Sequence, residues 1–457
     1  MATSPSANRP SRPLPYSGYH HRPPQDDDHL LTQVGPGTSC GEYLRRYWHP
    51  FMLASELKDL PKAVRLLGED LVVFRDRSGR IGLLHRHCIH RGASLEFGIP
   101  VERGIMCCYH GWHFDIDGTV LATPAEPETS NIRHNFCQGA YAACEAYGLI
   151  FAYLGPPHLK PALPAYDTFD HPADTKLAPF SAEQPCNWLQ IVENAADPIH
   201  TAYLHAIVSQ QFSRAFAVQP ALDFVETPLG FLSMATRRVK DRVFMRASDV
   251  ILPNVGQFTA ARNRAESDSF QISTTTTRWV TPYDDHNSVY IGVAHLNTVT
   301  NPEGRITEDM FGVGKRNSIG QTPDRPYEER QREPGDYDAV VAQGVVANRA
   351  NEHLGSTDRG IVLLRRMLRK AIAAAQEGTV PATPRLAGNG PTPTYTHAAV
   401  MRLPSETALG DFEALERFGR EAAQIVIETD RFTPKEREAV AEDRIRRLLA
   451  EQTAAPA

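Results

Sequence analysis

The sequence contains no run of about 18 or more apolar residues, the length that a helix needs to cross a membrane. Its first thirty residues are rich in Pro, Ser, His and Asp and lack the apolar core of a secretory signal. The net charge is also small, because the chain has 48 Lys and Arg and 54 Asp and Glu. This composition does not indicate binding to nucleic acid or another polyanion. We therefore expect a cytoplasmic protein with no membrane or nucleic-acid partner.

Cysteine is sparse as well, with seven residues in 457. An odd number of cysteines in so long a chain argues against a disulfide scaffold and for reduced thiols or metal ligation. The seven are Cys40, Cys88, Cys107, Cys108, Cys137, Cys144 and Cys186.

A chain of 457 residues is too long for one ordinary domain, so at least two globular units are expected. Residues 1–35 are Pro-rich and poor in aliphatic side chains, which predicts a disordered N-terminal arm. Residues 36–155 open with a predicted helix at "CGEYLRRYWHPF" and continue as short apolar runs separated by turns, such as Asp117-Gly118. This pattern predicts a small antiparallel β domain.

Residues 156–380 form the second predicted domain, after a Pro-rich joint. A helical stretch, "NWLQIVENAADPIHTAYLHAIV", precedes alternating segments such as "RVFMRASDVILP" and "SVYIGVAHLN". These segments predict an antiparallel sheet. Residues 381–457 read as a Pro/Gly linker followed by a charged helical tail.

The stretch from Cys88 to Trp112 contains two mixed pairs, C-x-H and C-x-x-H. Two thiolates, from Cys88 and Cys107, with two imidazoles, from His90 and His110, match the Rieske arrangement, in which histidines replace cysteines on one iron of a [2Fe–2S] centre. A Cys2His2 zinc site is the alternative. Structural zinc ligands, however, usually come as C-x-x-C and H-x-x-x-H pairs.

This stretch resembles the Rieske domain of bacterial ring-hydroxylating oxygenases, which reads C-x-H-R-G-A-x-L and then C-x-Y-H-G-W-x-F-D-x-x-G. Cys108 departs from the pattern, since many members have Pro there, and we interpret it as a spectator thiol. The resemblance implies an α+β protein. Its parts would be an all-β Rieske domain and a catalytic domain whose antiparallel sheet wraps around helices, a helix-grip or START-like fold.

A second motif, "NWLQIVENAADPIHTAYLH", resembles the iron-binding helix of the same family and assigns Asp197, His200 and His205. Two histidines and a carboxylate on one face of an iron leave positions open for O2 and substrate. Residues five apart do not share a face of an ideal α-helix, so we predict locally distorted helix, such as a π-type turn. Two unrelated surface histidines are the alternative, and Asp197 before Pro198 could also be a helix cap.

The third iron ligand lies in a segment with several carboxylates. In the phthalate dioxygenase branch, which this chain resembles, the ligand Asp precedes a Gly by eight positions and an R-x-x-E-H-L-G-x-x-D pattern follows. Counting back from Gly344 selects Asp336, with Asp338 as second choice. Asp358 suits the cap of a helix beginning near Gly360.

The resemblance implies a terminal oxygenase that activates O2 at a mononuclear Fe(II), with electrons from the Rieske cluster, to hydroxylate an aromatic substrate, an aromatic acid above all. It implies that Asp197 couples His110 of one subunit to the iron of the next, in a homotrimer or a dimer of trimers. The implied electron source is a separate NAD(P)H-dependent flavin/iron–sulfur reductase, and the role is in aromatic catabolism.

Three alternatives stay open at this point. The enzyme could be a monooxygenase that removes methyl groups from methoxylated aromatics. From other classes, the chain could be a Rieske electron-transfer protein without a working mononuclear iron, or a zinc-stapled binding protein. Arg237, Arg238 and Arg246 could clamp a substrate carboxylate or could be sheet-surface charges facing water.

Overall fold

The structure is a computed structural model that describes residues 15–16, 18, 25–169, 172–259, 265–314, 322–379, 391–403 and 412–454. Most of the predicted disordered arm therefore lies outside the described residues. The end of that arm is part of the folded protein, since it contains a short helix, α1 (His29–Thr32). Leu31 is buried there, and its carbonyl accepts a hydrogen bond of 3.0 Å from Trp188 Nε1. Leu30 and Leu31 are a single apolar pair among polar residues, which is too short a pattern to predict this contact from the sequence.

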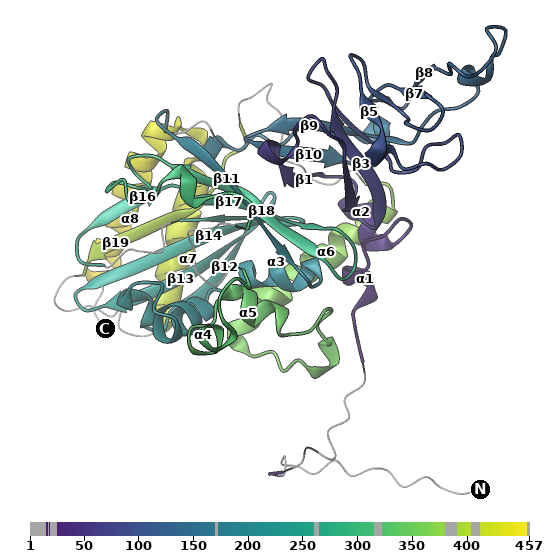
Figure 1. Cartoon of the computed structure of the whole chain (residues 1–457). Helices are drawn as coiled ribbons and strands as arrows, with labels where there is room; N and C mark the ends of the chain where they lie inside the picture. The colour runs from purple at the N-terminus through teal and green to yellow at the C-terminus, as the bar shows by residue number, and fades with distance from the viewer. Residues whose placement is uncertain are drawn as a thin grey trace, which may run out of the picture.

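The first lobe is built from two antiparallel sheets, at the upper right of Figure 1. The larger sheet has the order β1-β10-β9-β4-β3-β2, and the smaller has the order β5-β6-β7-β8. The strands are β1 (Trp48–Leu53), β2 (Lys62–Leu66), β3 (Glu69–Arg75), β4 (Ile81–His85), β5 (Ile99–Pro100), β6 (Ile105–Met106), β7 (His113–Phe114), β8 (Val120–Ala122), β9 (Ala140–Ala146) and β10 (Leu149–Tyr153).

The leading helix of this lobe is shorter than its sequence predicts. Helix α2 spans Ser39–Leu44, and the residues from Trp48 onward form strand β1 instead. Pro50 explains the difference, because proline lacks the amide N–H that a continuing helix would need. Every residue of β1 is buried, and the strand pairs with β10.

The second lobe is dominated by a nine-stranded antiparallel sheet in the order β11-β18-β17-β15-β14-β13-β12, with β16 and β19 attached. Its strands are β11 (Lys176–Gln184), β12 (Ala221–Thr227), β13 (Gly230–Val239), β14 (Arg242–Ile251), β15 (Val255–Phe258), β16 (Ser269–Ile272), β17 (Thr276–Pro282), β18 (Ser288–Leu296) and β19 (His397–Arg402).

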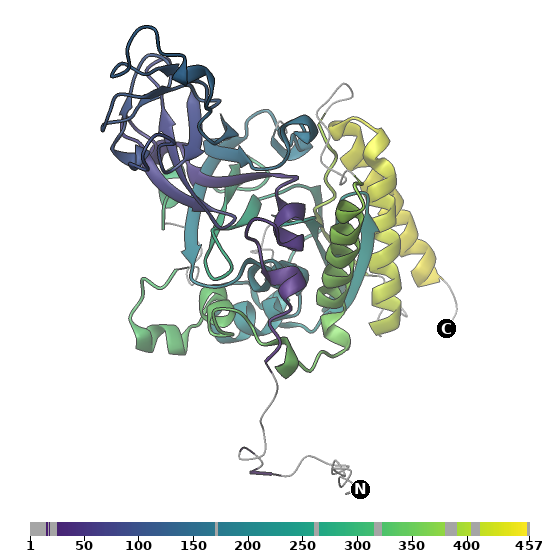
Figure 2. The ribbon, with the colours of Figure 1, turned by 90° about the vertical axis from the view of Figure 1, so that its right-hand side faces the viewer.

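Helices cover both faces of this sheet, as Figures 1 and 2 show. Because side chains alternate along a strand, Phe231 of β13 packs with Trp188 on one face, whereas Leu232 packs with Phe418 on the other. The helices of this lobe are α3 (Trp188–Ala196), α4 (Tyr327–Arg332), α5 (Asp336–Val341), α6 (Arg359–Gln376), α7 (Phe412–Glu428) and α8 (Pro434–Ala454). Within the described residues, no helix is long and apolar enough to span a membrane.

The C-terminal segment is more closely tied to the second lobe than its sequence suggests. Strand β19 pairs with β14 on one side and β16 on the other, so residues beyond 391 contribute to the sheet itself. This strand was not predicted, because "HAAVMR" is short and follows a long Pro/Gly-rich stretch. The domain boundaries near residues 155 and 380 stay a proposal.

Helix α7 provides a test of how firmly this segment is held. Phe418 is fully buried in the cluster between α7 and the sheet, and its neighbour Arg417 is exposed. Phe418→Ala should lower the free energy of unfolding by about 3–5 kcal/mol, because it leaves a cavity in the core. Arg417→Ala should change it by less than about 0.5 kcal/mol. Urea denaturation of both variants checks this, and equal effects would contradict the packing.

Candidate functional site

Two loops of the first lobe carry the paired cysteines and histidines. The first loop follows β4, and the second connects β6 with β7. In each loop a glycine amide donates to the carbonyl of the cysteine, Gly92 to Cys88 at 2.8 Å and Gly111 to Cys107 at 3.0 Å. Both glycines have a positive φ, of 75° and 72°, which glycine adopts without strain. The two loops therefore turn alike and present their side chains in similar ways.

The four side chains of these loops lie together. The His90 and His110 rings are 4.7 Å apart, and His90 stacks on Trp112. Cys88 and Cys107 are both buried. Burial, opposed by the His90 amide and reinforced by the adjacent Cys107 thiol, raises the pKa of the Cys88 thiol to about 11. Thiolates at this position thus need a bound cation to stabilise them.

The spacing of these side chains can be compared with the spacing that a single zinc ion requires. Ligand atoms of one tetrahedral zinc ion lie within about 4 Å of one another. In the described part of the chain, only His200, His205 and Asp336 bring three such atoms within 4.8 Å of one another. The four loop side chains are therefore more widely spread than a single zinc ion requires. A pair of bridged irons suits that wider spacing.

Gln138 holds the first loop in place and was missed in the sequence. Its Oε1 accepts a 2.8 Å hydrogen bond from the Ile89 amide. Its Nε2 donates to the carbonyls of His85 and His87 at 2.9 and 3.0 Å. No sequence signal identifies this role, because Gln138 lies about fifty positions after the loop and outside both motifs.

His200 and His205 lie at a break between two kinds of helix. Helix α3 ends before Asp197, and a π-helix, η7, spans Thr201–Val208. The π-helix is wound more widely than an α-helix, so residues five apart come onto one face. The two imidazole rings are 5.3 Å apart. The prediction of locally distorted helix is confirmed.

Asp336 meets both imidazoles at the first residue of α5. Its Oδ1 lies 2.9 Å from His205 Nε2 and 3.7 Å from His200 Nε2. The carboxylate and the two ring nitrogens thus converge from segments more than a hundred positions apart in the sequence. The arrangement is that of two imidazoles and one carboxylate on one side of a metal, which leaves further positions open.

Asp197 contacts the opposite edge of the His200 ring, with its Oδ2 3.7 Å from Nδ1. Its Oδ1 also accepts a 3.0 Å hydrogen bond from the Ile199 amide, but Asp197 follows the last residue of α3 and does not cap η7, whose N-cap residue is His200. Burial alone would lower the pKa of His200, but Asp197 and Asp336 together raise it. Asp197 is thus placed to orient His200 and to attract its proton.

Two further side chains support the other members of the triad. Gln211 Oε1 lies 3.1 Å from His205 Nδ1, and Asn194 Nδ2 donates to Asp336 Oδ1 at 3.4 Å. Such outer partners fix the orientation of metal ligands. The sequence analysis assigned neither residue. Asn194 is a fixed position of the second motif, so its role could have been predicted from the sequence. Gln211 lies in the loop after η7, outside the motif, and no sequence pattern indicates its role.

The two other carboxylates of this region point elsewhere. Asp338 accepts hydrogen bonds from Arg330 Nε at 2.7 Å and from the Gly335 amide at 3.0 Å. Asp358 stands at the N-cap position of α6, but its carboxylate accepts from the Gly355 amide instead of the helix. Neither residue joins the triad.

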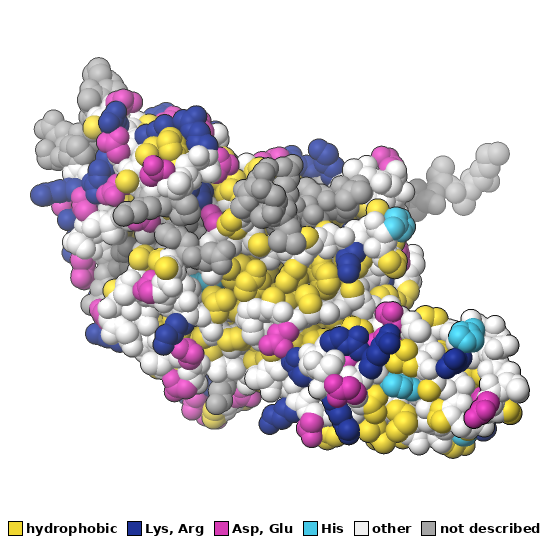
Figure 3. All heavy atoms as spheres, turned by 90° about the horizontal axis from the view of Figure 1, so that it is seen from above, with side chains coloured by type: hydrophobic (Ala, Val, Ile, Leu, Met, Phe, Trp, Pro, Cys, Tyr) yellow, Lys and Arg dark blue, Asp and Glu magenta, His cyan; other side chains and the backbone are white. Residues whose placement is uncertain are grey.

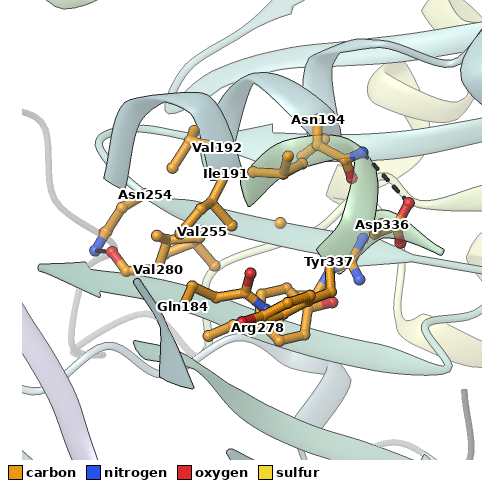
Figure 4. A pocket seen from close by; sticks show the side chains of 14 residues that line it. Gln184, Ile191, Val192, Asn194, Asn254, Val255, Arg278, Val280, Asp336 and Tyr337 are labelled. Atoms are coloured by element: carbon orange, nitrogen blue, oxygen red, sulfur yellow. Dashed lines mark hydrogen bonds between the residues drawn. The ribbon is translucent and has the colours of Figure 1, made fainter. Parts of the chain in front are cut away.

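Two hollows border the triad. Figure 4 shows the smaller one, between α3 and the sheet, below the hydrogen bond from Asn194 to Asp336. Its volume of ≈ 30 Å³ holds about two water molecules and no aromatic ring. The larger is an open depression of ≈ 440 Å³ whose lining includes Asp197, His200 and Arg365. The depression makes the outer side of Asp197 accessible from the surface.

Comparisons with known proteins identify the family. Residues 47–135 match the family described as the Rieske [2Fe-2S] domain. The chain is 42% identical over 441 residues to the tert-butanol monooxygenase / tert-amyl alcohol desaturase oxygenase subunit of Aquincola tertiaricarbonis, which covers 91% of this chain and 92% of that protein. It is 37% identical over 391 residues to the phenoxybenzoate dioxygenase subunit alpha of Ectopseudomonas oleovorans, covering 80% and 89%.

A solved structure shares the architecture. The crystal structure of dicamba monooxygenase bound to dicamba superposes with a TM-score of 0.55 at 19% identity, covering 73% of this chain and 98% of that one. At this identity the likeness shows the fold alone. The predicted α+β class, a β domain followed by a catalytic domain with an antiparallel sheet and helices, is confirmed.

Proposed function

This chain belongs to the Rieske non-haem iron oxygenases as an alpha, or terminal oxygenase, subunit, and we propose which of its residues hold the two metal centres. Cys88, His90, Cys107 and His110 are the proposed ligands of the [2Fe–2S] cluster. The proposed ligands of the mononuclear iron are His200, His205 and Asp336. The convergence of these last three side chains within 4.8 Å is the observation that carries the proposal.

The donor sets fit the two groups. Two thiolates and two imidazoles on separate loops offer one pair of ligands to each iron of a cluster. Two imidazoles and one carboxylate are the ligand set of non-haem Fe(II) oxygenases. When bound, the cluster supplies electrons one at a time and the iron provides the place where O2 is activated. Cys108 is exposed and does not fit as a cluster ligand.

The protein's own residues set the orientation of the two imidazole rings. Asp197 Oδ2 lies 3.7 Å from His200 Nδ1, which orients the ring with Nε2 toward Asp336. Gln211 does the same for His205, because its Oε1 faces Nδ1. Both imidazoles are therefore turned with Nε2 toward Asp336.

The placement of the two lobes supports a proposal of electron transfer between copies of the chain. In Figures 1 and 2 the loops around β5, β7 and β8 lie at the far end of the molecule from α3 and α5. We propose that Asp197 receives His110 of the partner subunit, in a ring of three chains. Asp197 is reachable through the open depression, and the first lobe exposes Ile89, Phe97 and Tyr109. Figure 3 shows hydrophobic and histidine side chains together on that lobe, at the right.

A separate reductase is the proposed source of electrons. The described residues form a β lobe and a sheet-and-helix lobe, and each lobe carries one of the proposed metal centres. The relatives are named as oxygenase subunits, which indicates systems of more than one component. We propose an NAD(P)H-dependent flavin/iron–sulfur reductase as the other component.

The substrate we propose is an aromatic acid, as the name of the phenoxybenzoate relative suggests. A second candidate is a tertiary alcohol, which the relative with 42% identity is named for. O-demethylation of a methoxylated aromatic is a third, since the chain is 31% identical to the 5,5'-dehydrodivanillate O-demethylase oxygenase subunit of Sphingobium.

A substrate panel tests these candidates directly. The holoenzyme with a surrogate reductase should oxidise aromatic acids faster than tert-butanol or methoxybenzenes, with label from 18O2 appearing in the product. The number of labelled oxygen atoms separates monooxygenation from dioxygenation. Turnover of tert-butanol alone would show that the substrate is a tertiary alcohol and not an aromatic acid. Product without 18O label from every substrate would refute an oxygenase.

Iron analysis tests the ligand assignment. Wild-type protein should contain about three irons per chain, and Asp336→Ala about two, because only the mononuclear site loses its carboxylate. Asp338→Ala is the matched control on the same helix and should keep all three. Loss of iron from the Asp338 variant with retention in the Asp336 variant would reverse the assignment.

Asp197→Asn tests the coupling between the two centres. The variant should keep both metals, since its side chain is not a ligand, yet lose about 100-fold in product formation per reduced cluster. Single-turnover assays with chemically reduced enzyme measure this without the reductase. Asp338→Asn serves as the control, and full activity in the Asp197 variant would exclude the coupling role.

A further inference from the structure

Arg237 and Arg246 lie side by side on the inner face of the large sheet. Strands β13 and β14 pair with Ala235 opposite Arg246 and with Arg237 opposite Phe244. Residues that face each other across an antiparallel pair, and those two positions further along, point to the same side. Arg237 has no exposed surface and Arg246 is 9% exposed. The alternative left open by the sequence, charges that face water, is therefore wrong for these two.

Neither guanidinium has an acidic partner among the described residues. Arg237 donates from Nε to the Val218 carbonyl at 3.0 Å, and Arg246 donates from Nη2 to the Thr259 carbonyl at 3.2 Å. Arg237 Nη1 and Arg246 Nε are buried without any hydrogen-bond partner. Rings of Phe216 and Phe244 lie over the guanidinium faces but leave these N–H groups unsatisfied.

Other buried arginines of the chain show what is missing here. Arg45 pairs with Glu69 at 3.0 Å, Arg437 with Asp167 at 3.2 Å, and Arg349 with Glu193 at 3.4 Å. Buried charges are usually compensated in this way, because leaving one unpaired in a low dielectric is costly. The pair on the sheet is the exception within the described residues.

Burial without an acidic partner lowers the pKa values of both arginines. Burial, and then the positive charge of Arg246, lowers the pKa of Arg237 to about 9. Burial lowers the pKa of Arg246 to about 10. Two like charges therefore destabilise each other inside the protein, and a bound anion would relieve both.

The arginine pair is adjacent to the iron triad. Arg237 Nη2 donates to Thr201 Oγ1 at 3.4 Å, and Thr201 follows His200 directly. Two phenylalanine rings connect His205 with the arginine pair. Phe212 stacks on His205 at 4.5 Å, and Phe216 lies 5.0 Å from Phe212 and beneath both guanidiniums.

We propose that Arg237 and Arg246 bind the carboxylate of an aromatic acid and so position its ring beside the iron, against Phe212 and Phe216. Guanidinium groups suit this task because their planar N–H pairs match a carboxylate. The inference rests on the proposed oxygenase function and narrows its substrate to anions. A neutral tertiary alcohol would leave the two charges uncompensated.

Binding measurements test this without turnover. Isothermal titration of the anaerobic holoenzyme compares benzoate with benzamide and 3-phenoxybenzoate with its amide. Wild-type protein should bind each acid at least about tenfold more tightly than its amide. Arg237→Met and Arg246→Met should each weaken binding of the acids by about tenfold to a hundredfold and leave the amides unchanged. Arg238→Met, on the opposite face of β13, is the matched control and should behave as wild type.

The outcomes are distinct. Equal binding of acid and amide by the wild-type protein, or no binding of either acid, overturns the proposal even if a variant fails to fold. Loss of acid and amide binding together in the methionine variants also overturns it, since that result indicates a packing role. Iron analysis of the same samples separates this inference from the proposed function. Absence of the mononuclear iron would refute the proposed function, whether or not the acids bind.

Discussion

The catalytic lobe depends on one geometric constraint: two imidazoles five residues apart must face the same carboxylate. An α-helix would separate them around its axis, so the backbone adopts a π-helix immediately after the Asp197-Pro198 break. Asp336 completes the set only because α5 begins where the two rings meet. The remaining features of the lobe hold these three side chains in place or bring something to them.

The surroundings of the triad divide into two sides with different properties. On the outer side, Asp197 lies in a depression open to the surface, which suits an approaching protein surface and electron transfer. On the inner side, Phe212, Phe216 and two uncompensated arginines face the interior of the sheet, which suits a small anion with an aromatic ring. In our proposals, electrons reach the iron past Asp197 and substrate reaches it past the arginines.

The parts that the sequence predicts are those whose residues lie close together in the chain. The cluster loops and the histidine helix each fit within about 25 positions, so spacing and chemistry indicate them together. Asp336 lies 131 positions after His205, and only resemblance to a family selected it. Strand β19 and the role of Gln138 depend on pairing across the fold, which no local pattern encodes. The burial of Arg237 and Arg246 could not be predicted for the same reason, because the register between β13 and β14 and the helices that cover the sheet decide it.

The central claim is that one chain holds two separate iron sites, a cluster on the first lobe and a single iron in the second. Anomalous diffraction from crystals of anaerobically prepared holoprotein, measured on both sides of the iron absorption edge, tests it most directly. The account predicts a two-iron feature between the loops of Cys88 and Cys107, and a separate single peak among His200, His205 and Asp336. A peak at the loops alone, or a signal at the zinc edge in either place, would contradict it.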